Sequence, residues 1–220
     1  MKIILPALGA LLFLAGCSDK KQAATTEEAA PAVTPQIKQT SLADYKSYFK
    51  YTDLDSFAID SFNWDNRLGQ YKELDSNTFK LVWQNSKRVF IGKDYDRDYF
   101  HSWQNRNPDF TEFTVLTQDE SSYCDLLHYL IYDKNGKAID SFIAAAGCGD
   151  GGWGLHSYGR FISEDTYEET TVETEMVEID SVTNAEVVEG DSTVTHYTIG
   201  PDGRVTQKEI SKTPIRRIYN

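Results

Sequence analysis

The clearest structural signal in the pattern of apolar and polar positions lies around residues 126–143. An apolar run at 129–132 leads into the polar segment 133–137, which contains Asn135-Gly136, and a second apolar run follows at 138–143. Asn-Gly between apolar runs predicts a β-hairpin, because both residues tolerate the positive φ angles of a tight turn. Leucines at 126, 127 and 130 also fit a helical period, but the turn that follows at once favours strands.

Similar patterns predict further strands along most of the chain. The expected strands are 79–83 and 88–91, which should pair, then 110–117, 155–162, 170–179, 193–199 and 204–210. Pro201-Asp202-Gly203 predicts a hairpin turn between the last two strands. The alternation changes phase at Met176-Val177, which predicts a β-bulge.

Two segments have helical spacing instead. Ser41 and Asp44 form an S-x-x-D capping pattern ahead of a helix expected over 42–50. Tyr95, Tyr99 and Trp103 recur every four residues and predict a second short helix over 94–105. Together these patterns predict a mainly β (α+β) domain: an antiparallel β-meander of hairpins with one or two short N-terminal helices.

The N-terminus carries an export signal. Lys2 precedes an apolar stretch that begins at Ile3 and closes with Leu14-Ala15-Gly16-Cys17. This segment resembles the lipobox signal of bacterial lipoproteins, and the apolar stretch is too short to span a bilayer as a helix. The resemblance implies cleavage before Cys17, a diacylglycerol on Cys17 and anchoring to a membrane by lipid. Ser18 after the lipidated cysteine implies transfer to the outer membrane.

The resulting organisation is a signal peptide over 1–16, a lipidated flexible tether over 17–40 and a single β-rich globular domain over 41–220. The tether is rich in Ala, Thr, Glu, Gln and Pro and shows no apolar periodicity. Whether the domain faces the periplasm or the medium is not encoded in a recognisable pattern.

The formal net charge of −12 limits the classes of molecule that the protein is expected to bind. An acidic surface repels phosphate backbones and anionic lipids, so nucleic acid is not an expected partner and the acyl chain is the main membrane attachment. Residues 163–191 hold 11 acidic residues and no Lys or Arg. This segment is either a solvated strand face or a docking face for a basic partner.

The chain has three cysteines, and lipidation of Cys17 would leave two. In an exported, oxidising compartment Cys124 and Cys148 are expected to form a disulfide, which the hairpin at 133–137 would support by placing them opposite each other. Two buried free thiols are the alternative.

Two candidate binding sites stand out. Residues 147–154 contain five glycines, so this segment is either a binding loop with Asp150 as a polar contact and Trp153 as an apolar platform, or a glycine-rich crossover. Tyr95, Tyr99 and Trp103 form either an aromatic patch for sugar rings or a partner, or the face of a helix that packs on the sheet.

No motif assigns a catalytic, metal or cofactor site. The acidic pattern at 94–98 departs from a calcium loop because Tyr99 stands where Gly is needed, and no HExxH, CxxC, P-loop or G-x-S-x-G motif occurs. We therefore expect no cofactor and no metal, and name no catalytic residue.

The sequence leaves three functional classes open. The first is a non-enzymatic binding module for a partner protein or an envelope glycan. The second is a carboxylate-dependent hydrolase of polysaccharide or peptidoglycan, since acid pairs are abundant. The third is an inhibitor or immunity-type lipoprotein.

Overall fold

The computed structural model describes residues 41–59, 69–84, 86–92, 96–179, 182–183 and 185–219. The signal peptide, Cys17, the tether and Tyr95 lie outside the described residues. No helix in the described part is long and apolar enough to cross a membrane.

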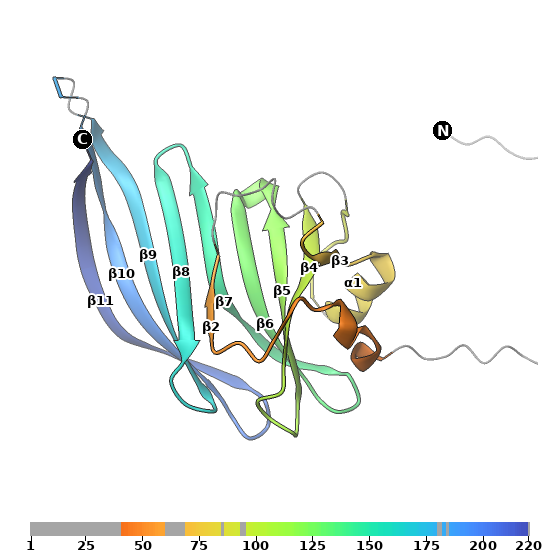
Figure 1. The fold of residues 1–220 in the computed structure, drawn as a ribbon. Coiled ribbons are helices and arrows are strands. Elements are labelled where there is room, and N and C mark those ends of the chain that lie inside the picture. Colours follow the sequence, from red (N-terminus) through yellow and green to blue (C-terminus); the bar gives the residue numbers. More distant parts are fainter. Residues whose placement is uncertain are drawn as a thin grey trace, which may run out of the picture. The chain divides into compact units, whose positions relative to one another are not determined.

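The described residues form a mainly β fold with one mixed sheet (Figure 1). Its strands are β1 (Tyr51–Thr52), β2 (Ser56–Ala58), β3 (Lys72–Glu73), β4 (Arg97–Gln104), β5 (Thr111–Asp119), β6 (Cys124–Tyr132), β7 (Ala138–Asp150), β8 (Trp153–Phe161), β9 (Thr166–Ile179), β10 (Glu186–Ile199) and β11 (Val205–Tyr219). The helical elements are the 3₁₀ helices η1 (Leu42–Tyr48) and η3 (Glu120–Ser122) and the α-helix α1 (Ser76–Val82).

The strands from β4 to β11 follow one another in the sheet, each antiparallel to the next. This order confirms the predicted antiparallel meander. Three short strands join this meander: β1 pairs parallel with β4, β3 pairs with β4, and β2 pairs with the interior strand β8.

Turn chemistry explains why the hairpins were predictable. Gly136 adopts a φ of 78° and its N–H donates to the carbonyl of Asp133 at 3.0 Å, which closes the β6–β7 turn. Gly203 has the same φ of 78° between β10 and β11. The predicted bulge is also confirmed, because Val187 pairs with Glu178 and Val188 with Met176, leaving Val177 as the extra residue.

The N-terminal helix is confirmed as the 3₁₀ helix η1. The Ser41 N–H donates to Asp44 Oδ2 at 2.9 Å, as the capping pattern predicts. Its Leu42 side chain is buried against the sheet.

The strand predicted over 79–83 is wrong, because this segment is the last part of α1. The Asp75 carboxylate accepts hydrogen bonds from the N–H groups of Asn77 and Thr78 at 3.0 and 2.8 Å, so a helix N-cap decides the local structure. Phe79 and Val82 then share one helix face and are buried on the sheet. The partner strand predicted over 88–91 is also wrong: these residues form no strand.

The second predicted helix is wrong as well, because residues 97–104 form β4. A bulge at His101, where Phe100 pairs with Val115 and Ser102 with Thr114, turns the residues that follow it to the opposite face of the sheet. Tyr99 and Trp103 therefore lie in different apolar clusters and are only 1% and 7% exposed. The two residues do not form an exposed aromatic patch.

Two apolar clusters lie on the two sides of the sheet around β4–β6. One is covered by η1 and α1 and contains Leu42, Leu74, Phe79, Val82, Trp83, Phe100, Trp103, Phe113, Val115, Leu130 and Tyr132. The other draws on β2, β4–β7, β9 and β10 and contains Phe57, Ile59, Tyr99, Leu116, Leu127, Tyr129, Ile131, Phe142, Ala144, Ala145, Tyr167 and Ile199.

Beyond these clusters three strands run on together. Figure 1 shows β9, β10 and β11 (blue) extending past the end of β8. We call residues 172–179, 186–194 and 211–219 the outer ribbon. Most of its side chains are exposed or half-buried, and β11 forms the edge of the sheet.

Candidate functional site: a groove beside Trp153

The glycine-rich segment is the tight turn of the β7–β8 hairpin. Asp150 pairs with Trp153, and Gly151 and Gly152 between them adopt φ angles of 56° and 124°. Glycine suits these conformations, which other residues rarely adopt. The turn is fixed to the next strand, because the Met176 N–H donates to the Gly152 carbonyl at 2.7 Å.

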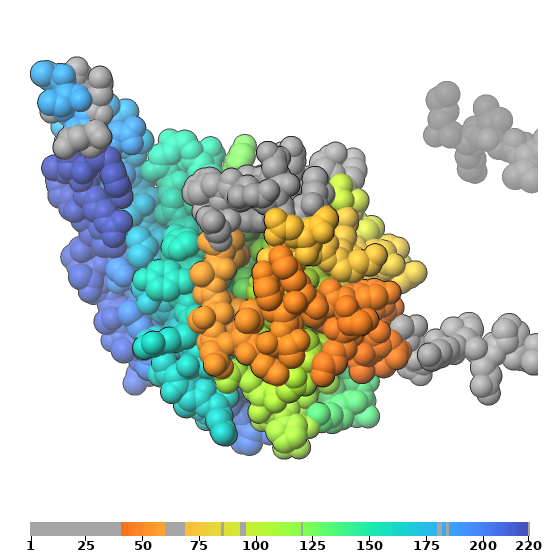
Figure 2. Space-filling view, viewed as in Figure 1, coloured from red at the N-terminus to blue at the C-terminus, as the bar shows by residue number. Residues whose placement is uncertain are grey.

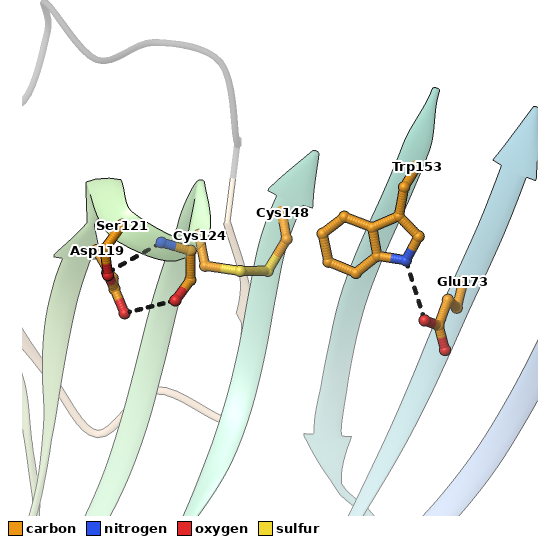
Figure 3. The surroundings of a disulfide bond; sticks show 7 residues. Asp119, Ser121, Cys124, Cys148, Trp153 and Glu173 are labelled. Atoms are coloured by element: carbon orange, nitrogen blue, oxygen red, sulfur yellow. Dashed lines mark hydrogen bonds between the residues drawn. A yellow bond between two sulfur atoms is a disulfide. The ribbon is translucent and has the colours of Figure 1, made fainter. Parts of the chain in front are cut away.

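Trp153 leaves this turn as the first residue of β8 and is held by β9. Its indole Nε1 donates to Glu173 Oε1 at 3.0 Å (Figure 3). The half-buried indole also packs, with Leu155, against a small cluster that contains Cys124, Ala146 and Cys148. One side of the ring is thus anchored while the other remains open to solvent.

The predicted disulfide stands at this end of the sheet. Cys124 and Cys148 are directly opposed on β6 and β7, with Cα atoms 4.1 Å apart, and are bonded to each other. Figure 3 shows the disulfide, Trp153 and Glu173 on successive strands. The bond confirms the sequence-based pairing and fixes the hairpin arm that carries Trp153.

A groove of about 360 Å³ opens beside the indole. It is lined by Trp153, Glu173, Thr174, Glu175, Val177, Glu189, Gly190 and Asp191. The structure therefore joins two separate predictions, the aromatic platform at Trp153 and the acidic segment 163–191, in one surface feature. We call it the Trp153 groove.

The carboxylates of the groove are only partly balanced by cations. Lys212 Nζ lies 3.0 Å from Asp191 Oδ2, and the hydrogen bond to Asp191 raises the pKa of Lys212. Arg216 forms an ion pair with Glu189. Glu173 accepts the indole N–H and also interacts electrostatically with Lys212, whereas Glu175 enters no ion pair within the described part of the chain. The groove thus keeps an excess of negative charge.

Gly190 allows the groove to take its shape. A Cβ atom at this position would collide with the backbone carbonyl of Glu173 on the neighbouring strand. Only glycine permits so close an approach of β10 to β9 here.

Asp150, the second residue of the predicted binding loop, is exposed at the turn and does not line the groove. Lys212 and Arg216 could not be predicted as part of the site, because nothing in β11 alone indicates that its cations pair with acids of β10. Tyr158 and Arg160 of β8 were not predicted either, although His156, Tyr158 and Arg160 occupy alternate positions of a predicted strand.

The carboxyl groups whose pKa is raised lie outside the Trp153 groove. Burial raises the pKa of Asp98, Glu112 and Glu169, and these side chains lie in or beside the two apolar clusters. Among the described residues no group of three or more His, Cys, Asp or Glu side chains is placed to hold a metal ion.

Comparison with known proteins found no matching family model, no matching curated protein and no matching solved structure.

Proposed function

We propose that this protein is a lipid-anchored protein of a bacterial envelope and that its domain is a non-enzymatic binding module for a cationic segment of a partner protein. The lipobox-like sequence ending at Cys17 supports the anchor, and Ser18 favours the outer membrane. Residues 17–40 would then separate the domain from the lipid.

The observation that carries the binding function is the combination of an anchored indole and uncompensated carboxylates in one groove. Glu173 fixes Trp153 by a hydrogen bond, and Glu175 faces the groove without an ion-pair partner among the described residues. A guanidinium or ammonium group is attracted by the carboxylates and can also lie over the face of a Trp ring. An arginine- or lysine-containing segment therefore fits both features.

The test is a binding titration with the mature, lipidated chain in detergent and a short fluorescent Arg/Gly peptide. The double variant Glu173→Gln/Glu175→Gln should weaken binding by about three- to tenfold, because each partly exposed charge pair contributes up to about 1 kcal/mol. Raising the salt concentration should reduce the difference between the two proteins, since salt screens such pairs.

The matched control is Glu164→Gln/Glu178→Gln, which removes the same charge from exposed positions outside the groove. If this control weakened peptide binding as much, net charge and not the groove would be responsible, and the proposal would be wrong. A photo-crosslinker placed at 175 in the native envelope should capture a partner that the same group at 164 does not.

A further inference from the structure

The face of β8 opposite to that of Trp153 carries a row of exposed side chains with flat polar groups. His156, Tyr158 and Arg160 alternate along the strand and are all exposed, whereas Ser157 between them is 1% exposed. Alternate residues of a strand point to the same face, so the three groups form a line. The ring centroids of His156 and Tyr158 are 5.7 Å apart.

Small neighbours leave the Tyr158 ring standing above the sheet. Its cross-strand partners are Ala58 on β2 and Thr170 on β9. Neither side chain is long enough to cover a phenol ring, and Tyr158 is 45% exposed. The short strand β2, orange in Figure 2, lies beside β8 and forms one wall of this surface.

A groove of about 440 Å³ runs past the ring. It is lined by Ser56, Phe57, Ala58, Tyr158, Gly159, Arg160, Glu168 and Thr170. Its volume falls in the range of about 300–1,000 Å³ in which small-molecule sites lie. We call it the Tyr158 groove.

The charged groups of the Tyr158 groove balance one another. Arg160 and Glu168 are cross-strand partners of opposite sign, and Glu168 Oε2 lies 3.0 Å from His196 Nε2. The remaining lining side chains are uncharged. A polymer with charge of either sign therefore gains no net attraction, while the guanidinium and the carboxylate can donate to and accept from hydroxyl groups.

The row of His156, Tyr158 and Arg160 is held in place by the packing of the β8 backbone on the core. A Cβ atom at Gly159 would lie 2.7 Å from the Tyr167 ring and would also collide with the Glu168 carbonyl. Because Gly159 has no side chain, β8 lies directly on the buried Tyr167, whose hydroxyl donates to the Ala144 carbonyl at 2.6 Å. The platform is thus built on the core of the domain.

We propose that the Tyr158 groove binds a neutral glycan. One pyranose ring would stack on Tyr158, and Arg160, Glu168, Ser56 and Thr170 would hydrogen-bond its hydroxyl groups. The exposed flat phenol offers an apolar face to the C–H side of a sugar ring, and its polar surroundings match the hydroxyl rim. This site lies on the opposite face of β8 from Trp153 and does not depend on the function proposed for the Trp153 groove.

The test uses the mature, lipidated chain and an array of neutral oligosaccharides of glucose, mannose or N-acetylglucosamine beside uronic-acid and sulfated oligosaccharides. The neutral probe that binds best is then titrated by calorimetry. Tyr158→Ala should weaken binding about tenfold, because a stacked ring contributes a free energy of this order. Tyr158→Trp should bind as tightly as the wild type or more tightly, because the flat apolar face is kept.

Tyr219→Ala is the matched control, since Tyr219 is 49% exposed but lies at the far end of β11. It should leave glycan binding unchanged, as should Glu173→Gln/Glu175→Gln. Thermal melts of every variant verify that it folds. Failure of all neutral oligosaccharides to bind, binding of charged ones only, or equal binding by Tyr158→Ala would each overturn the proposal.

Discussion

Two strands of the same sheet, β5 and β11, differ strongly in how many of their side chains are buried. β5 has seven consecutive buried residues, because apolar clusters lie against both of its faces. β11 is almost entirely exposed, with only Val205 and Ile215 half-buried. Side-chain packing therefore stabilises the centre of the sheet around β5. Around β11 the paired strands mainly hold side chains exposed to solvent.

The exposed edge at β11 is protected against pairing with other chains. Pro214, opposite Asp191, has no N–H to offer, and a bulge at Ile210 interrupts the register with β10. Lys208, Lys212, Arg216 and Arg217 add charge along the strand. The faces of the outer ribbon, and not its edge, are therefore the surfaces suited to recognition.

The largest effect expected from this comparison is the loss of a central ring. Phe113 is fully buried and stacks between Trp103 and Tyr132, with ring centroids 6.0 and 5.1 Å away. Phe113→Ala should lower the free energy of unfolding by about 3–5 kcal/mol, because it removes a large apolar contact and leaves a cavity. Denaturant unfolding measures the change.

The paired substitution in the ribbon is Tyr219→Ala. Because this side chain is half exposed at the end of the edge strand, the free energy of unfolding should change by less than about 0.5 kcal/mol. Equal costs for the two substitutions would show that the ribbon is packed as the centre is, and the comparison would be wrong.

The same contrast explains what the sequence could predict. The strands β6, β7, β10 and β11 were predictable because recognisable turns join β6 to β7 and β10 to β11, and β9 was predictable because alternation marks its solvated face. β4 was mistaken for a helix because four of its buried residues are polar, namely Asp98, His101, Ser102 and Gln104, so polar and apolar positions do not alternate along it. The four-residue spacing of Tyr99 and Trp103 also fits a helix as well as a strand.

The candidate sites followed a similar rule. Trp153, the acidic segment and the disulfide could be proposed from the sequence, because composition alone marks glycine clusters, charge runs and a pair of cysteines. The Tyr158 groove depends on which small residues flank Tyr158 on β2 and β9. Pairing between strands about 100 residues apart leaves no local pattern in the sequence.

The disulfide links β6 to β7 beside the turn that leads into β8. Its half-cystines are separated by 24 residues. Cys124→Ser/Cys148→Ser should lower the free energy of unfolding by about 3 kcal/mol, because the unfolded chain regains the entropy of that loop. Urea unfolding measures this loss. Labelling of both cysteines by a thiol reagent in unreduced, denatured wild-type protein would contradict it.

The loss of folding stability at acidic pH should come from groups in the buried centre of the sheet. Desolvation lowers the pKa of His101 from 6.5 to about 4, with a smaller contribution from Lys50, and its Nδ1 lies 2.9 Å from Thr114 Oγ1. Since the folded-state pKa is depressed, the neutral imidazole's contribution is present above pH 6.5 and is lost as pH falls toward 4. Its full size is on the order of 3 kcal/mol.

The measurement is the free energy of unfolding as a function of pH for the wild type and His101→Gln. The difference between them should change mainly between pH 6.5 and 4. Burial lowers the pKa of His128, which acts with the same sign as His101, and raises the pKa of Asp98, Glu112 and Glu169, which act with the opposite sign. All four groups are present in both proteins, so the difference isolates His101. If this difference stayed constant between pH 6.5 and 4, the assignment to His101 would fail.

A smaller loss of stability than those in the centre is expected from a substitution in the outer ribbon. Gly190→Ala forces a methyl group against the Glu173 carbonyl, so β9 and β10 must move apart at the floor of the Trp153 groove. The cost should be about 1–2 kcal/mol, as for other overpacked positions. Hydrogen exchange should speed up in residues 172–179 and 186–194 while β5 and β6 keep their protection.

Gly154→Ala is the matched control, because a Cβ there meets its nearest atom, Thr174 Oγ1, at an ordinary 3.8 Å. Faster exchange throughout the sheet after Gly190→Ala would mean that the outer ribbon and the centre open as one unit, which would contradict the comparison between the two regions.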